Sequence, residues 1–274
     1  MQLIFLVAFL SLNFMSTYCQ QDKIVEDELL LTLDEKNALG KFQQALKDDK
    51  FLNITEPYMM QEIYLIKWLR AAHLDTAKAY NNYRMNIKWR KENKMDTILT
   101  EDFAVQMEHL PIFIDGEDKM GRPIIAADAG QWDVRRGVVS GLRDMATRFL
   151  YYVIEKQYKK IREKQYKGEN VTQIQVIVDL SGYNLVQHGC LNCIPLYINF
   201  IRSFDHYPYL AHSIIVVNAP PVFEAVADLL NLRQPRRFRV HIFGNNKSEW
   251  HKFLLTFISP NQLPVFLGGT AVEN

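Results

Sequence analysis

The chain has 274 residues, of which 48% are hydrophobic and 12% aromatic, and its formal net charge is +1 at neutral pH. This length accommodates one large domain or two modest ones, each with an ample hydrophobic core. The composition excludes a disordered chain, and the near-zero net charge gives no support to binding of nucleic acid through overall charge. A function that needs positive charge must therefore depend on a local cluster.

The first 19 residues contain no charged side chain and include an apolar run from Leu3 to Leu12. This run is shorter than the roughly 20 apolar residues that a membrane-spanning helix needs. We interpret residues 1–19 as a signal peptide that directs the protein to the secretory pathway, although a positively charged N-terminal side chain is missing. Removal of this segment leaves an even number of cysteines. The alternative is a buried or membrane-resting N-terminal helix in a cytoplasmic protein. Three N-glycosylation sequons follow, at Asn53, Asn170 and Asn246.

Residues 20–95 show helical patterns throughout. Thr32 followed by Glu35 predicts a capping box at the start of one helix, and Asp75 is the expected N-cap of another. The aromatic side chains between them are predicted to form the core of a small helical bundle. Four cationic residues lie at the C-terminal end of this region: Lys88, Arg90, Lys91 and Lys94. Their clustering is explained by the helix dipole, which cations complement at a helix C-terminus.

From about residue 96 to residue 274, predicted strands alternate with predicted helices. This alternation indicates an α/β domain with a mostly parallel sheet, preceded by the helical region 20–95. The expected strands are 112–114, 123–126, 174–179, 214–217, 240–243 and a short last one at 263–267. The expected helices are 141–164, 190–204, 222–230 and 250–257.

A dense group of arginines follows the predicted helix 222–230, at Arg233, Arg236, Arg237 and Arg239. The helix carries an apolar stripe, and the arginines lie in the turn before the next strand. One interpretation is a solvated turn whose arginines pair with nearby carboxylates. The other is a local site for anionic groups, because guanidinium groups suit phosphate.

Signatures of catalysis are mostly missing from the sequence. It contains no G-x-S-x-G elbow, glycine-rich phosphate loop or H-E-x-x-H helix. Asp179 ends a predicted strand, and we expect it to form a turn with Ser181. Cys190 and Cys193 leave three interpretations open: a structural disulfide, a redox pair, or two ligands of a zinc site that also uses His188.

Short motifs in a fixed order extend over residues 60–270. They are Leu65–Ala71, Leu74–Ala79, Trp89–Asn93, Asp118–Pro123, Val178–Gly182, Asp205–Pro208, Ile215–Phe223, His241–Gly244 and Gln262–Thr270. In this order and spacing the chain resembles the CRAL-TRIO family of lipid-binding and lipid-transfer proteins.

The resemblance implies a sheet that floors an apolar pocket and a helical gate at 222–230. The expected function is non-enzymatic binding and transfer of a tocopherol, a retinoid or a phospholipid by a monomer, with no cofactor and no metal. The expected pocket residues are Phe149, Tyr152, Val153, Ile177, Ile194, Ile198, Ile201, Val217, Phe223 and Val226. The resemblance also suggests that Arg236, Arg237 and Arg239 contact phosphoinositide headgroups or an anionic membrane. The alternatives are a docking module that uses the basic turn 233–239 and a Cys-x-x-Cys oxidoreductase.

Three positions depart from the family pattern. Tyr209 replaces the glutamate of phosphatidylinositol-transferring members, and His212 stands where another member has an arginine. His73 replaces the second arginine of a Leu-Arg-Ala-Arg motif. These departures weaken the expectation of phosphoinositide recognition and leave the ligand open.

Overall fold

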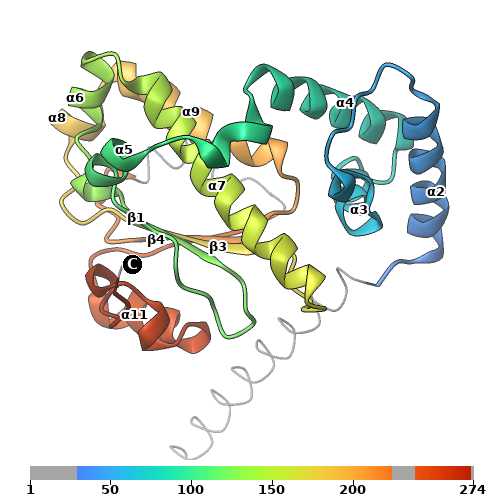
Figure 1. The fold of residues 1–274 in the computed structure, drawn as a ribbon. Helices are drawn as coiled ribbons and strands as arrows, with labels where there is room; N and C mark the ends of the chain where they lie inside the picture. Colours follow the sequence, from blue (N-terminus) through green and yellow to red (C-terminus); the bar gives the residue numbers. More distant parts are fainter. Residues whose placement is uncertain (1–29, 224–237, 273–274) are drawn as a thin grey trace, which may run out of the picture. The chain divides into compact units, whose positions relative to one another are not determined.

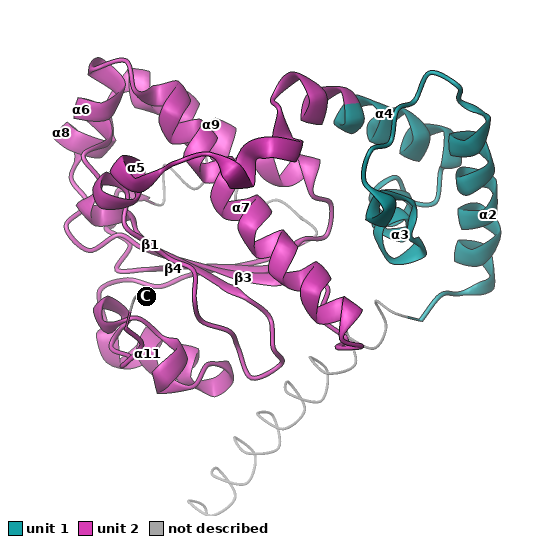
Figure 2. Ribbon diagram, viewed as in Figure 1, with its two compact units in different colours: residues 1–87 teal, residues 88–274 magenta. Residues whose placement is uncertain are grey.

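The computed structural model describes residues 30–223 and 238–272, and these form two compact units (Figures 1 and 2). The units are Met1–Ile87 and Lys88–Asn274. The division lies inside helix α4, Thr76–Glu92, whereas the sequence pattern changes at about residue 96. The last turn of α4 carries Trp89 and Arg90, whose side chains contact residues of the second unit, and this explains the earlier boundary.

Unit 1 is a small helical assembly. It contains α2, Leu33–Asp48, the 3-10 turn η1, Pro57–Met60, α3, Glu62–Ala71, and the first part of α4. The capping box is confirmed, since the Thr32 hydroxyl accepts from the Glu35 amide and the Glu35 carboxylate accepts from the Thr32 amide. The Asp75 cap is also confirmed, because its carboxylate accepts from the amide of Lys78. The rings of Tyr64, Trp68 and Tyr83 pack in the core, mostly edge to face.

Unit 2 is an α/β domain built on a five-stranded sheet in the order β1-β2-β3-β4-β5. The strands are β1, Ile112–Phe113; β2, Ile124–Asp128; β3, Ile174–Asp179; β4, Ala211–Val217; and β5, Arg239–Ile242. The first pair is antiparallel and the other three are parallel. The expected mostly parallel sheet is therefore confirmed.

The helices of unit 2 connect and cover these strands. They are α5, Ala104–His109; α6, Val134–Val139; α7, Arg143–Tyr166; α8, Leu185–His188; α9, Ile194–Ser203; and α11, Lys247–Phe257. Short 3-10 turns lie between them: η2, Met95–Thr100; η3, Ala129–Gln131; η4, Leu191–Cys193; η5, Phe204–His206; η6, Pro260–Gln262; and η7, Val265–Leu267.

The two faces of the sheet have different coverings (Figure 1). Helix α11 lies on one face, where Trp250, Leu254 and Phe257 form a buried core with inward residues of four strands. Helices α7 and α9 lie on the other side and contact each other, and Leu150 and Leu196 from them pack with Ala127 of β2. Because side chains alternate along a strand, each position is assigned to one of these two faces.

Three sequence predictions need comment. The expected strand at 263–267 is wrong: the structure has turn η7 there, with only an isolated bridge between Pro264 and Ala271. Pro264 has no N–H to donate, and Gly268 follows in the left-handed conformation. The predicted helix 190–204 is divided into η4 and α9. Most of the predicted helix 222–230 lies outside the described residues.

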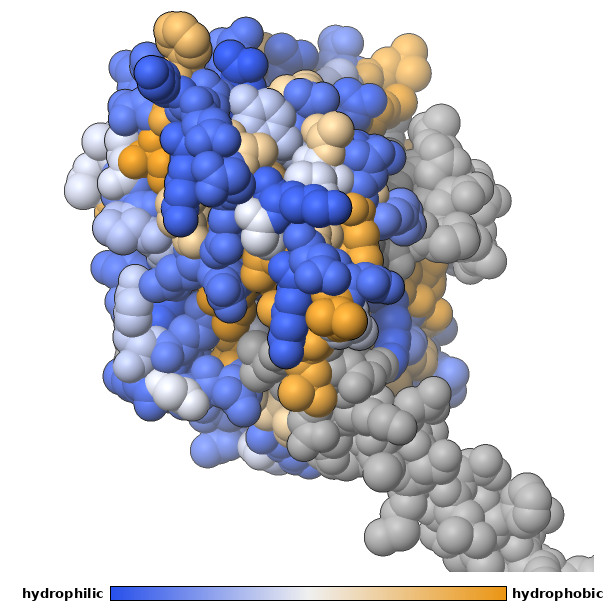
Figure 3. Space-filling view, turned by 90° about the vertical axis from the view of Figure 1, so that its right-hand side faces the viewer, coloured by the Kyte–Doolittle hydropathy of each residue, from blue (hydrophilic) through white to orange (hydrophobic). Residues whose placement is uncertain are grey.

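The described part of the chain contains no helix that is both long and apolar enough to cross a membrane. The side of the molecule shown in Figure 3 is mainly hydrophilic, with hydrophobic side chains in separate small groups.

Candidate functional site

A cavity of about 550 Å³ opens at the carboxyl ends of the parallel strands β3, β4 and β5. Its lining comes from the loops after these strands, at Leu180–Tyr183, Asn218–Pro221, Ile242, Gly244 and Asn245. Open α/β sheets bind ligands at this edge, because the loops that follow the strands converge there. The cavity is open to solvent on one side, and its volume is in the range of clefts that bind small organic ligands.

The wall of the cavity is held by a chain of polar side chains. The indole N–H of Trp250 donates to Asn218 Oδ1 over 3.2 Å, and Asn218 Nδ2 donates to Asp179 Oδ1 over 2.8 Å. Asn218 has φ 54°, a left-handed conformation that asparagine tolerates better than most residues. The same Asp179 oxygen accepts from the amide of Ser181 over 2.8 Å, which confirms the predicted turn. The loops after β3 and β4 are thereby tied to each other and to α11.

A second carboxyl lies beside Asp179. Asp128 ends β2 and is the direct partner of Asp179 across the parallel pair. Burial and the negative charge of Asp179 raise the pKa of Asp128 to about 6. The edge of the sheet next to the cavity therefore carries a carboxyl that takes up a proton in mildly acidic solution.

The loop after β3 approaches another turn very closely. A Cβ atom added at Gly130 would lie 1.9 Å from the carbonyl oxygen of Ser181, so only glycine fits in η3. Gly182 has φ 86°, which also favours glycine. These two glycines fix the path of the loop that lines the cavity.

The predicted pocket residues divide into four groups. The prediction that Ile177 and Val217 line the pocket is wrong. Both residues belong to the core against α11, on the face of the sheet away from α7 and α9. Phe149 and Val153 are buried in α7, where the Phe149 ring packs against Phe103 and Tyr152.

The half-buried residues Ile194, Ile198 and Ile201 share one side of α9, and Tyr152 of α7 is also half-buried. On the sheet, Val178 and Ile242 are half-buried on the face that alternates away from α11. Partly covered apolar side chains are thus present on both α9 and the sheet. Phe223 is buried at the edge of the described residues, and Val226 lies outside them.

The basic cluster is only partly described. Arg233, Arg236 and Arg237 lie outside the described residues, and Arg239 begins β5 with an exposed side chain. His212, one of the departures from the family pattern, is buried, and its Nδ1 lies 2.9 Å from Gln173 Oε1. Burial, with nearby cations, lowers the pKa of His212 to about 3. This histidine therefore provides no positive charge at neutral pH.

Cys190 and Cys193 form a disulfide in the structure. As members of a disulfide they offer no thiolate to a metal, so they do not act as zinc ligands with His188 in this form. Among residues 30–223 and 238–272, no group of three or more His, Cys, Asp and Glu side chains is arranged to hold a metal ion. The redox interpretation of this pair stays a prediction.

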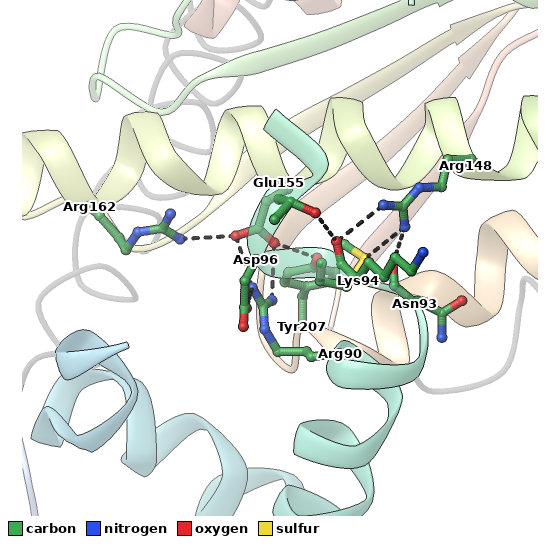
Figure 4. A network of polar contacts seen from close by, with 10 residues as sticks. Arg90, Asn93, Lys94, Asp96, Arg148, Glu155, Arg162 and Tyr207 are labelled. Carbon is green, nitrogen blue, oxygen red and sulfur yellow. Dashed lines mark hydrogen bonds and ion pairs between the residues drawn. The ribbon is translucent and has the colours of Figure 1, made fainter. Parts of the chain in front are cut away.

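A buried polar network in unit 2 was missed by the sequence interpretation (Figure 4). Glu155 of α7 is only 3% exposed and accepts from Arg90 over 3.1 Å and from the Tyr207 hydroxyl over 2.6 Å. Arg162 approaches the same carboxylate at 3.5 Å. Arg90 is thus a buried ion-pair partner, and the helix dipole does not explain it. Its sequence position among exposed lysines gave no signal of this role.

A neighbouring arginine extends this network. Arg148 of α7 donates to the backbone carbonyls of Asn93 and Lys94 and pairs with Glu101 (Figure 4). The ring of Trp89 stacks on His206, with centroids 3.6 Å apart. Burial and the charge of Arg90 lower the pKa of His206 to about 4, so the stacked ring is neutral at physiological pH. Together these contacts fasten the end of α4 and the segment after it to α7 and η5.

Comparison with known proteins gives one family and several relatives. A family model described as the CRAL/TRIO domain matches residues 107–269, more than half of the chain. Phosphatidylinositol/phosphatidylcholine transfer protein SFH9 of Arabidopsis thaliana is 25% identical over 250 residues, which cover 86% of this chain and 41% of that protein. Protein real-time of Drosophila melanogaster is 26% identical over 211 residues, covering 75% of this chain and 32% of that protein. Patellin-2 of Arabidopsis thaliana is 23% identical over 220 residues, covering 78% of this chain and 31% of that protein.

The chain thus spans between about a third and two fifths of the length of these curated relatives. Among solved structures, Sfh5 matches with a TM-score of 0.65 at 14% identity, covering 82% of this chain and 84% of that one. At this identity the match establishes a shared fold.

Proposed function

Because this chain belongs to the CRAL/TRIO domain family, we propose that it binds one hydrophobic molecule and transfers it between membranes without chemical change. The observation that carries the proposal is the cavity of about 550 Å³ at the carboxyl ends of β3, β4 and β5. Its lining combines apolar groups such as Ile242 and Pro220 with a few fixed polar ones such as Asn218. Such a mixed lining offers apolar contact together with groups that can hold a polar end of the ligand.

A phospholipid is the ligand class that we favour over a tocopherol or a retinoid. The name of the relative SFH9 records transfer of phosphatidylinositol and phosphatidylcholine. The neutral, buried His212 and the replacement of glutamate by Tyr209 argue against an inositol headgroup held by charge. We therefore propose a zwitterionic phospholipid, with its polar end at the polar wall formed by Asn218 and the loop at Ser181.

Secretion remains part of this proposal. The signal-peptide interpretation of residues 1–19 and the sequons support it, and the described side chains of Asn53, Asn170 and Asn246 are exposed, as glycosylation would require. Secretory-pathway entry would also suit the disulfide Cys190–Cys193, because disulfides persist in oxidising compartments.

The site is tested by filling the cavity. Ala219 lies in the lining and is half-buried, so Ala219→Trp places a large ring in the space proposed for the lipid. Ala77, on the exposed side of α4, gives the matched control Ala77→Trp. We expect Ala219→Trp to reduce binding of fluorescent phosphatidylcholine at least severalfold and Ala77→Trp to leave it unchanged. Equal binding by both variants would exclude this cavity as the lipid site.

A further inference from the structure

One end of unit 2 exposes an unusual number of aliphatic side chains. Leu191 of η4 is 82% exposed, Val139 of α6 is 73% exposed, and Val186 of α8 is 67% exposed. Leu142, just after α6, and Leu185 of α8 are 46% and 56% exposed. Single exposed apolar residues are ordinary on a protein surface, but a contiguous group of them indicates an interaction site.

These side chains come from segments that lie together in the fold. Helix α6 packs against both α8 and η4, and Figure 1 shows α6 and α8 at the same end of unit 2. Arg135 Nη1 donates to the carbonyl oxygen of Val186 over 3.4 Å, which links α6 directly to α8. The disulfide Cys190–Cys193 closes the turn that carries Leu191. We call the surface formed by Val139, Leu142, Leu185, Val186 and Leu191 the aliphatic tip.

The charges around the aliphatic tip identify its partner. Arg135 and Arg136 of α6 are exposed, and within residues 30–223 and 238–272 neither forms an ion pair with a carboxylate. Nearby, the Asp133 carboxylate caps α6 by accepting from the amide of Arg136, and Asp144 pairs with Arg143. The stretch from Ser181 to Cys193, which carries α8 and η4, has no acidic or basic side chain except the buried His188.

A surface of exposed aliphatic side chains with two exposed guanidinium groups that make no ion pair within the described residues matches the headgroup region of an anionic bilayer. Aliphatic side chains enter the boundary between headgroups and acyl chains, and the guanidinium groups bind lipid phosphates. We propose that the aliphatic tip is the surface with which this protein docks on anionic phospholipid membranes. This inference deepens the proposed function, since a lipid carrier has to reach a bilayer to exchange its ligand.

The test uses the full-length chain, so the apolar N-terminal segment is the same in every variant. The double variant Val139→Asp/Leu191→Asp places two charges in the aliphatic tip. Val265 and Val272 give the matched double control Val265→Asp/Val272→Asp, since they are 71% and 77% exposed and follow α11, which covers the other face of the sheet. Flotation with vesicles of phosphatidylcholine and phosphatidylserine measures the bound fraction. We expect the double variant to lower the partition coefficient about tenfold and the control to leave it unchanged.

The charge component is tested separately. Arg135→Gln/Arg136→Gln should lower binding to anionic vesicles severalfold and leave binding to pure phosphatidylcholine vesicles unchanged. Lys247→Gln/Lys252→Gln on α11 removes the same charge from exposed positions elsewhere and serves as the control. Circular dichroism verifies that each variant is folded.

Flotation of the double aspartate variant at the wild-type level would overturn the proposal, as would an aliphatic tip that captures a protein partner without binding vesicles. Different measurements refute the docking proposal and the carrier proposal. Native mass spectrometry of the docking variants reports lipid occupancy, which these surface changes should leave at the wild-type level. A wild-type protein that binds vesicles through the aliphatic tip but never holds a lipid would contradict the carrier function alone.

Discussion

Replacement of Glu155 by glutamine tests whether the buried network of unit 2 depends on charge. The change preserves the size of the side chain but removes its negative charge. In the structure, Oε2 accepts from Arg90 and Tyr207, and Oε1 lies 3.5 Å from both Arg90 and Arg162. Each oxygen therefore faces two donors. At the Oε1 position the glutamine NH₂ group faces two guanidinium donors, and at the Oε2 position it faces Arg90 and the Tyr207 hydroxyl, which can turn to accept from it. Either orientation therefore loses at least one hydrogen bond from a buried guanidinium.

The expected cost follows from burial. Glu155 and Arg90 are 3% and 5% exposed, so the variant leaves a buried guanidinium with a weakened set of acceptors. Removal of one partner of a buried ion pair typically costs 3–5 kcal/mol. Since Asp96 still lies 3.4 Å from Arg90, we expect the lower end, about 3 kcal/mol. Tyr207→Phe removes a single hydrogen bond from the same carboxylate and should cost about 1–2 kcal/mol.

Urea unfolding of the two variants and the wild type, followed by far-UV circular dichroism, measures these differences. Because the chain has two compact units, the transition of unit 2 has to be identified before a free energy is assigned to it. A cost below about 1 kcal/mol for Glu155→Gln, or a larger cost for Tyr207→Phe, would refute the charge-based account of the network.

Two further predictions concern the edge of the sheet beside the cavity, and a third concerns the disulfide Cys190–Cys193. Asp128→Asn should raise the free energy of unfolding at pH 7 by about 1 kcal/mol, after allowance for the partial exposure of Asp128. Because the pKa of Asp128 is raised in the folded protein, the wild type should lose stability as the pH rises from about 4 to about 6. Urea unfolding at several pH values should show this loss in the wild type and not in the variant. Gly130→Ala should destabilise the protein by more than 2 kcal/mol in urea unfolding, because the added Cβ collides with the Ser181 carbonyl. The control Gly137→Ala in α6 has free space around the added Cβ and should be neutral or slightly stabilising. Insulin reduction should be absent in the wild type; activity that disappears in Cys190→Ser would instead support the redox alternative.

Local patterns were sufficient for much of the fold. The β-branched runs at 174–179 and 214–217 are strands β3 and β4, and Thr32 with Glu35 caps α2 as expected. The turn between Asp179 and Ser181 was predictable because its two partners are only two residues apart in the sequence. In each case the interactions that decide the structure are near in sequence.

Features that depend on distant residues were not predictable in the same way. Ile177 and Val217 lie in runs, 176–178 and 214–217, in which every residue is apolar, so these runs have no period that tells which face meets α11. Arg90 lies among exposed cations at a helix end, and its partner Glu155 is 65 residues away. The exposure of Leu191 follows from a turn closed by a disulfide, where the apolar pattern indicated a continuous helix.

The claim that this protein is a lipid carrier is tested most directly by identifying the molecule that the purified protein holds. Protein purified from its natural source is analysed by native mass spectrometry, and the bound material is then released, extracted and identified by lipid analysis. We predict one hydrophobic molecule per chain, a zwitterionic phospholipid, with reduced occupancy in Ala219→Trp. A protein that is repeatedly isolated without any bound lipid, and that takes none from vesicles, would contradict the account.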